Sequence, residues 1–153
     1  MRKVMIAVAM AVLMAGPLFA AEKSEKSEVM SVVNQLVDAF NKGDTKTVLA
    51  VSADDVSIID EFLPYEWHGA GSCSRYFADY DTHAKQNGIT DGIFGIRKPR
   101  HFEITGDHAY VVFPAWYTYK QNGKPKKENG TSVIVLQKGK DGWRITSWSW
   151  AKN

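Results

Sequence analysis

The chain from residue 100 onward strongly limits the folds that are available to it. Segments rich in β-branched and aromatic residues follow one another here, and only short stretches containing Gly, Asn and Asp separate them. Such connections are typical of hairpins, so consecutive segments should pair as antiparallel strands. The predicted strands are RHFEIT (100–105), HAYVVFPAWYTYK (108–120), TSVIVLQKG (131–139) and WRITSWSWA (143–151).

The tight turn TGDH sorts the faces of the first two strands. If Thr105 pairs with His108, one face of this hairpin is entirely apolar and suited to packing against helices. Its predicted members are Phe102, Ile104, Ala109, Val111 and Phe113, with His101, Glu103, Tyr110 and Val112 on the opposite face.

Two features of the next segment affect this pattern. Pro114 cannot donate to a ladder, so we expect a bulge there, which leaves the facing of Trp116, Tyr117 and Tyr119 open by one residue. The stretch QNGKPKKENG (121–130) is expected to be a solvated hairpin loop, and its Lys residues also discourage edge pairing.

Helical spacing dominates before these strands. Residues 29–42 form one apolar face and end before Gly43, a good C-terminal signal. Asp44 can cap a second helix at 45–52, and Ser72 a third at 73–86. The second helix is expected to pack through Val48, Leu49 and Val51, and a strand is expected around Val56, Ile58 and Ile59. Helices first and a curled antiparallel sheet afterwards predict an α+β domain whose helices cover one sheet face.

The N-terminus reads as an export signal. Arg2 and Lys3 precede an apolar run at 4–14 and small residues that suit cleavage after Ala20. The run is shorter than the roughly 18 residues that span a bilayer, so no stable membrane anchor is expected. We therefore divide the chain into a signal peptide (1–20), a flexible charged leader (21–28) and one domain (29–153), located in the periplasm or outside the cell.

Composition excludes some functions. Without Arg2 and Lys3, the 19 Lys and Arg become 17, which balance the 17 Asp and Glu. The mature chain therefore has no general electrostatic attraction for nucleic acid. Cys73 is the only cysteine and cannot form an internal disulfide, which leaves stability to the core. The four His residues show no metal-ligand spacing, and no metal or cofactor is expected.

The order of these elements resembles a known family. A helix ending in AFNKGD, the stretch VLAVSADDVSIID, a Gly turn, a third helix and a meander ending in GWRITSWSW are similar to the SnoaL-like branch of the nuclear transport factor 2-like superfamily. The resemblance covers about 29–152. It implies a cystatin-like cone, with three N-terminal helices packed on a strongly curved antiparallel sheet and a pocket at the open end. The superfamily includes isomerases, dehydratases, cyclases and proteins that only bind ligands or partners.

Ketosteroid isomerases provide a specific comparison. They carry a catalytic Asp at the end of the first strand, and Asp60 in VSIIDEF matches that position. Their oxyanion hole uses a Tyr on the first helix and a protonated Asp on a later strand. The helix position is Leu36 here, and TSVIVLQ contains no acid. The resemblance therefore implies a base for some carbon-acid reaction, and speaks against steroid-type isomerisation.

The candidate site residues surround this acid. Asp60 and His68 are the candidate catalytic groups; the alternative is that Asp60 is an exposed or N–H-bonded acid at a strand end and that His68 is solvated or caps the turn. Glu61 should point away from Asp60, because strand side chains alternate. Aromatic side chains suit a pocket for a flat ligand, although such residues are more often core. The candidate ligand-binding residues are Trp67, Tyr76, Trp116, Tyr119 and Trp148.

These features leave three hypotheses open. The first is an exported protein that binds a small apolar or aromatic molecule in a pocket. The second is an isomerase-, cyclase- or dehydratase-type enzyme that uses Asp60 as general base on a carbonyl compound. The third is a homodimer whose open sheet face serves as an interaction module.

Overall fold

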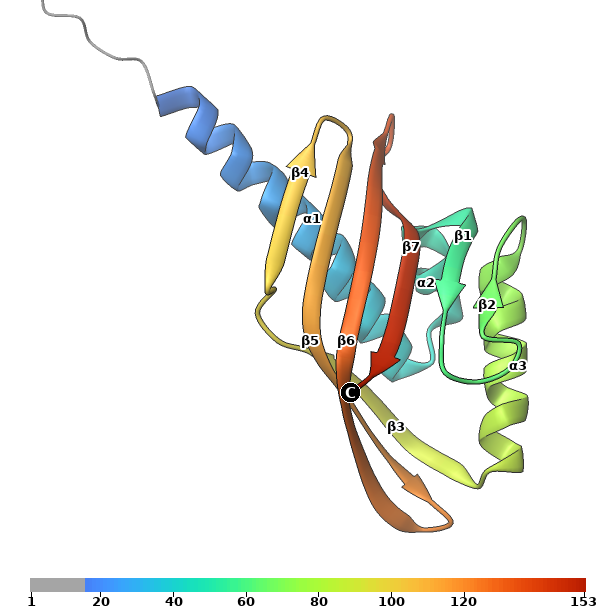
Figure 1. The fold of residues 1–153 in the computed structure, drawn as a ribbon. Coiled ribbons are helices and arrows are strands. Elements are labelled where there is room, and N and C mark those ends of the chain that lie inside the picture. Colours follow the sequence, from blue (N-terminus) through green and yellow to red (C-terminus); the bar gives the residue numbers. More distant parts are fainter. Residues whose placement is uncertain (1–15) are drawn as a thin grey trace, which may run out of the picture.

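The computed structural model describes the backbone of residues 16–153 and the side chains of residues 24–153. Three helices cover one face of a curved seven-stranded sheet (Figure 1). The α+β class, the three helices and the curved sheet are thus confirmed. The elements are α1 (Gly16–Lys42), α2 (Thr45–Val51), β1 (Ser52–Ile59), β2 (Glu66–Trp67), α3 (Ser72–Gln86), β3 (Ile89–Ile96), β4 (His101–Thr105), β5 (His108–Gln121), β6 (Lys124–Gly139) and β7 (Gly142–Lys152).

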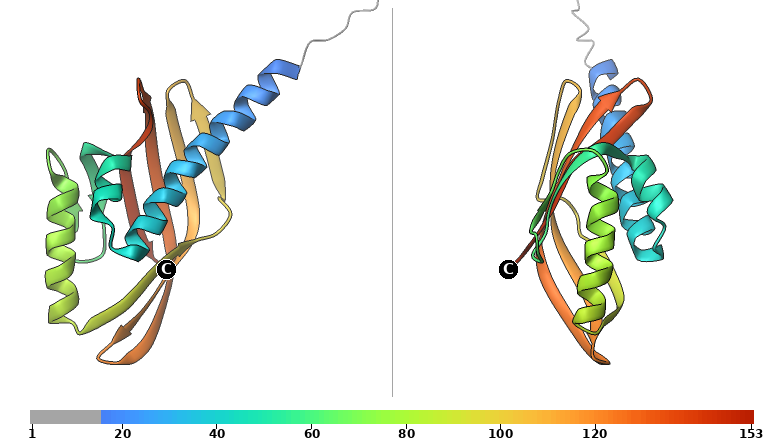
Figure 2. Two further views of the ribbon diagram at one scale, coloured as in Figure 1. Left: turned by 180° about the vertical axis from the view of Figure 1, so that it is seen from behind. Right: turned by 90° about the vertical axis from the view of Figure 1, so that its right-hand side faces the viewer.

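The sheet is mixed, which corrects the prediction of a purely antiparallel one. Its order is β2-β1-β7-β6-β5-β3, with β4 also paired to β5. Strands β4 to β7 form the predicted meander, but β1 lies parallel to β7, with Ile58 opposite Trp148. Pairing between the first and last strands is not encoded in any local turn. Figure 2 shows the helices on one side of this curved sheet.

The first hairpin has the predicted register. Thr105 lies opposite His108 and Phe102 opposite Val111. The predicted apolar face packs into the core, where Val111 and Phe113 are fully buried, and the opposite face is solvent-accessible.

Two expectations about β5 and β6 are wrong. The pairing of β5 with β6 runs through Pro114 and Thr131 without any shift, so there is no bulge. The carbonyl of Pro114 accepts from Arg97 N–H at 2.8 Å, which shows that this edge of the residue faces the β3–β4 connection and that no β6 ladder bond is lost. The expected loop at 121–130 is only a tight turn, because β6 already begins at Lys124.

The predicted cap is confirmed for α2 but wrong for α3, and one residue of α2 that was expected to pack is exposed. Asp44 caps α2 by accepting from Thr47 N–H at 3.1 Å, as predicted. Ser72 does not cap α3: Gly71 takes the cap position with a positive φ, and the Ser72 hydroxyl donates to the Val56 carbonyl at 2.5 Å. Leu49 is 44% exposed rather than packed.

Helix α1 begins earlier than expected. The charged stretch that we predicted as a flexible leader, residues 21–28, is helical. Lys138 on β6 lies 3.0 Å from Glu25 and 3.5 Å from Glu28, so this turn of helix contacts the sheet. Residues 1–15 of the predicted signal peptide lie outside the described residues, and residues 16–20 are the start of α1.

Strand β3 was not predicted, and it changes the shape of the molecule. Its sequence, ITDGIFGI, contains two glycines and lacks the alternation of a typical half-buried strand. Gly95 lies opposite Trp116 of β5, and a Cβ atom at Gly95 would lie 2.2 Å from the indole ring. The strand can therefore pair with β5 only because this position has no side chain. β3 runs beside the projecting β5–β6 hairpin in both figures.

Candidate functional site

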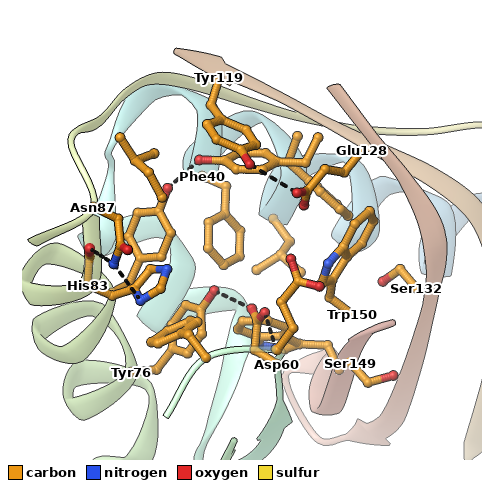
Figure 3. A pocket seen from close by; sticks show the side chains of 18 of the residues that line it. Phe40, Asp60, Tyr76, His83, Asn87, Tyr119, Glu128, Ser132, Ser149 and Trp150 are labelled. Atoms are coloured by element: carbon orange, nitrogen blue, oxygen red, sulfur yellow. Dashed lines mark hydrogen bonds between the residues drawn. The ribbon is translucent and has the colours of Figure 1, made fainter. Parts of the chain in front are cut away.

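A cavity of about 320 Å³ lies where the projecting strands bend towards α1 and α3. Most of its wall consists of aromatic and aliphatic side chains, and ionisable groups are concentrated on the loop after β1, on α3 and on β6 (Figure 3). It is lined by Leu36, Phe40, Asp60, Glu61, Phe62, Tyr76, Tyr80, His83, Asn87, Ile89, Phe94, Tyr117, Tyr119, Gln121, Glu128, Ser132, Ile134, Trp148, Ser149 and Trp150.

Strand β5 supplies one wall through simple alternation. Because there is no bulge at Pro114, the odd-numbered residues keep facing inward, so Tyr117 and Tyr119 line the cavity. Trp116 therefore faces outward across Gly95 and is not part of the lining. This corrects the placement of Trp116 in the predicted pocket.

Asp60 is the acid most closely enclosed by the cavity. Its carboxylate accepts hydrogen bonds from the Tyr76 hydroxyl at 2.8 Å and from Glu61 N–H at 2.7 Å (Figure 3). Burial raises its pKa above the ordinary value, although both hydrogen bonds act in the opposite direction. A carboxyl group that can hold or release a proton near apolar walls is suited to acid–base chemistry.

Two further carboxyl groups, those of Glu61 and Glu128, line the cavity with Asp60. We expected the Glu61 side chain to face away from that of Asp60. It does not, because β1 ends at Ile59 and strand alternation stops there. Burial and a hydrogen bond with Glu128 raise the pKa of Glu61. Burial also acts to raise the pKa of Glu128, but hydrogen bonds with Lys152, Glu61 and Tyr119 outweigh it and lower the pKa. Of the two groups, Glu61 therefore holds a proton more readily than Glu128.

Trp67 and His68 lie outside the cavity lining. Trp67 is 4% exposed, and its Nε1–H donates to Asp79 at 2.8 Å. Its ring packs edge-on against Tyr76 at 5.0 Å, so it supports the cavity wall from behind. His68 is exposed, and its carbonyl accepts from Arg75 at 2.6 Å in the turn. The structure places His68 outside the cavity that Asp60 lines, and the catalytic roles of both residues stay predictions.

The other predicted residues lie in the wall. Tyr76, Tyr119 and Trp148 all contribute to the lining. Trp148 is packed edge-on against both Phe40, at 5.3 Å, and Tyr76, at 4.7 Å, so its orientation is well defined. Their roles as ligand contacts remain predictions.

Sequence reasoning named Tyr76 on α3 but missed Tyr80 and His83 on the same face of the helix. Tyr76, Tyr80 and His83 recur at helical spacing and all line the cavity, a signal that the sequence does contain. The hydroxyls of Tyr80 and Tyr117 contact each other, which joins α3 to β5. His83 stacks on Phe62 with ring centroids 4.9 Å apart. Glu128 was missed because its segment was expected to be a loop.

Positions that carry the oxyanion hole in ketosteroid isomerases are apolar or neutral here. Leu36 lines the cavity from α1, and the part of β6 that was compared, residues 131–137, contributes Ser132 and Ile134 and contains no acid. The steroid-type donor set is therefore not present at these positions.

Other kinds of site are not evident in the part of the chain that the structure describes. No group of three or more His, Cys, Asp or Glu side chains there is arranged to hold a metal ion. Within the same residues, we find no helix that combines the length and the apolar character of a membrane-spanning segment. Burial raises the pKa of the Cys73 thiol to about 11, which keeps it protonated and unreactive.

Three helices on a curved, open sheet, with a cavity between them, define the domain as an α+β fold. Residues 29–150 match the SnoaL-like domain family, and the chain belongs to it. No curated protein matches the chain at a significant level.

Solved structures support the same fold. A nuclear transport factor 2-like superfamily protein from Salmonella enterica superimposes with a TM-score of 0.72 at 18% identity, covering 86% of this chain and 92% of that one. A protein with a cystatin-like fold from Novosphingobium aromaticivorans gives 0.72 at 11% identity, covering 94% and 92%. Hexachlorocyclohexane dehydrochlorinase from Novosphingobium barchaimii gives 0.72 at 9% identity, covering 88% and 90%. At these identities the likeness establishes the fold alone.

Proposed function

We propose that the protein binds a small, mostly apolar, ring-bearing molecule in the cavity lined by α1, the loop after β1, α3, β3 and β5 to β7. The observation that carries this proposal is an aromatic-walled space of about 320 Å³ with a few convergent polar groups. That volume lies at the small end of the range typical of ligand sites, about 300–1,000 Å³. Planar rings such as those of Phe40, Tyr117 and Trp148 favour flat partners through offset or edge contacts.

The polar groups restrict the charge of this ligand. Asp60, Glu61 and Glu128 are all acids on or near one side of the cavity. Their negative charge disfavours a carboxylate or phosphate in the same low-dielectric space. We therefore expect neutral compounds to bind more tightly than anions of the same shape.

A matched pair of variants tests this function. Ile89 lines the cavity from the start of β3, whereas the exposed Thr90 beside it does not. Ile89→Trp should fill the space and weaken binding of the neutral fluorescent probe N-phenyl-1-naphthylamine, and Thr90→Trp should leave it unchanged. Equal binding by wild type and both variants would place the probe elsewhere and contradict the proposal.

A second candidate function is proton transfer from carbon, with Asp60 as general base. It is favoured by the burial of this carboxyl group and by its hydrogen bond from Tyr76 at 2.8 Å. The carboxylate would take a proton from the carbon beside a carbonyl group, and the electron pair of the broken C–H bond would move onto the carbonyl oxygen. This would give an isomerase-, cyclase- or dehydratase-type enzyme.

Solvent exchange separates the two candidates. Wild-type protein in D₂O should exchange the protons next to the carbonyl of 2-tetralone, followed by NMR, and Asp60→Asn should slow this about 100-fold or more, as expected for loss of a general base. Exchange that persists in Asp60→Asn would remove the enzymatic proposal. Binding without exchange in the wild type would leave the protein as a ligand carrier.

Pairing of two copies is a further proposal, supported by the sheet face that the helices leave uncovered. Tyr110 is 44% exposed there, and Val112, Val133 and Val135 are partly exposed beside it in adjacent register positions. Apolar side chains grouped in this way favour an interface. Sedimentation at decreasing concentration should show a dimer that Val133→Lys dissociates, and a monomer at every concentration would contradict this.

Export to the periplasm or beyond is likewise proposed, on the basic start and the apolar run at 4–14. Mass spectrometry of the protein from intact cells should find an N-terminus near Ala21. A mature protein that retains residues 1–20 would contradict it.

A further inference from the structure

His83 has a defined orientation in the cavity wall. Its imidazole lies flat on Phe62, with centroids 4.9 Å apart and planes inclined by 28°. One ring nitrogen, Nδ1, faces the side chain of Asn87 at the end of α3. Figure 3 shows the other nitrogen, Nε2, turned toward the interior of the cavity.

The contacts of Asn87 determine which nitrogen carries the proton. The Asn87 amide nitrogen lies 2.8 Å from the backbone carbonyl of His83, and a carbonyl oxygen only accepts, so the group facing it must be the NH₂. The same NH₂ lies 3.3 Å from Nδ1 of the ring. Because an NH₂ group donates, Nδ1 must accept, and the proton of the neutral imidazole is on Nε2.

The donor that results is directed at the ligand space, whereas the neighbouring hydroxyls already have partners. Tyr76 donates to Asp60, Tyr119 donates to Glu128 at 3.0 Å, and the hydroxyls of Tyr80 and Tyr117 contact each other. His83 therefore offers an N–H donor to the same cavity that Asp60 lines.

We propose that His83 Nε2–H binds the carbonyl oxygen of a neutral, ring-bearing ligand, and that Asn87 holds the tautomer that makes this possible. The inference rests on the proposed function, because it assumes that the cavity takes a ligand. A neutral oxygen acceptor satisfies the N–H group, while an anionic one would meet the charge of Asp60, Glu61 and Glu128. The donor comes from the end of α3, and not from the positions of Leu36 and Ser132.

A one-atom change in the ligand tests the proposal. Wild-type protein should bind 2-acetylnaphthalene about tenfold more tightly than 2-isopropenylnaphthalene, in which a methylene group replaces the oxygen, as expected for one net hydrogen bond. Calorimetry should show that His83→Phe, which keeps a ring stacked on Phe62, binds both compounds equally. A preference for the ketone that survives in His83→Phe would overturn the proposal.

Two spectroscopic readouts complete the test. The ¹⁵N shifts of His83 should report the Nε2–H tautomer in the wild type and the Nδ1–H tautomer in Asn87→Asp, and the ketone preference should disappear with the change. The carbonyl stretch of bound 2-acetylnaphthalene should lie below its frequency in hexane. An unshifted stretch would overturn the role of His83 even if His83→Phe does not fold.

The outcomes also separate this inference from the function on which it rests. If both naphthalenes bind the wild type equally, the cavity takes a ligand but His83 does not recognise it. If neither binds, and N-phenyl-1-naphthylamine does not bind either, both the proposed function and the inference are wrong.

Discussion

The first half of β5, residues 108–114, and the second half, residues 115–121, point side chains toward the same face of the sheet. The first half packs into the core, whereas the second half lines the cavity. In the first half, Ala109, Val111 and Phe113 point inward and are at most 1% exposed. In the second half, Tyr117 and Tyr119 point the same way and line an open space of about 320 Å³. The inward and outward alternation of side chains along β5 therefore continues without a break from the filled core to the cavity.

The difference arises from what lies opposite each half. The first half faces the body of the domain, where aliphatic residues such as Val29 and Val33 of α1 are fully buried in the same core cluster. The second half faces rings of α1 and α3, including Phe40 and Tyr80. Side chains fill the core around the first half at close packing, whereas the rings around the second half do not meet across the space between them. Stability and binding are thus divided along a single strand.

The largest effect expected from this division is on stability. Phe113→Ala in the filled half should lower the free energy of unfolding by about 3–5 kcal/mol, because it removes a fully buried ring and leaves a cavity. Tyr119→Phe in the open half is the control, with an expected loss of about 1 kcal/mol or less for one hydrogen bond. Urea unfolding of both variants measures this. Equal losses would show that the two halves do not differ energetically.

Asp60→Asn should raise the stability of the folded protein, by less than Phe113→Ala lowers it. Burial raises the pKa of Asp60, so between the ordinary value of 3.8 and the raised pKa the folded state binds more protons than the unfolded state. Wild-type stability therefore falls as pH rises through this window, and Asn does not titrate. The variant should unfold at a higher temperature than wild type at pH 7, and the difference should vanish below pH 3.8. A difference that does not depend on pH would contradict burial as the cause.

Tyr76→Phe tests how the cavity holds its acid. The hydroxyl of Tyr76 lowers the pKa of Asp60, against the larger effect of burial. Its removal should therefore raise the pKa of Asp60 above the wild-type value and lower stability by about 0.5–1.5 kcal/mol. A ¹³C NMR titration of the carboxyl group measures the first effect. An unchanged or lower pKa would mean that the hydrogen bond is not formed in solution.

The smallest effect is expected beside the cavity. Lys152 contacts Glu128 but is half exposed, and such ion pairs contribute about 1 kcal/mol or less. Lys152→Met should change stability within that range while raising the pKa of Glu128, since Lys152 lowers it. Thermal unfolding at low and high salt provides the check, and a loss as large as that of Phe113→Ala would refute the distinction between core and rim.

The parts of the fold that could be predicted depend on local chemistry. The turn TGDH sets the register of β4 and β5 through neighbouring residues, and Asp44 caps α2 three residues away from its partner. Strand β3 could not be predicted, because Gly95 is explained only by Trp116 on the opposite strand. Glu128 of β6 was missed for a similar reason. A Lys-rich segment next to a turn favours a loop unless a partner strand extends the pairing.

The candidate site shows the same limit. Asp60 was found because it ends a strand with a clear apolar pattern, and the resemblance to a family places an acid there. His68 was predicted because an imidazole can act as acid or base near neutral pH, whereas the structure brings His83 and Asn87 to the cavity from the end of α3. The bulge expected at Pro114 left the facing of Trp116 open, because a shift of one residue reverses the facing of every residue that follows, and the unshifted ladder turns Trp116 outward.

The sequence by itself determined the α+β class, the cap of α2, the inward face of the first hairpin and the presence of an acid after β1. Only the tertiary structure decided that β1 lies parallel to β7, that β3 extends the sheet, and that Tyr117 rather than Trp116 faces the cavity. The reason is physical: periodicity and capping act over a few residues, whereas an unfilled space depends on how side chains from distant segments fit against one another.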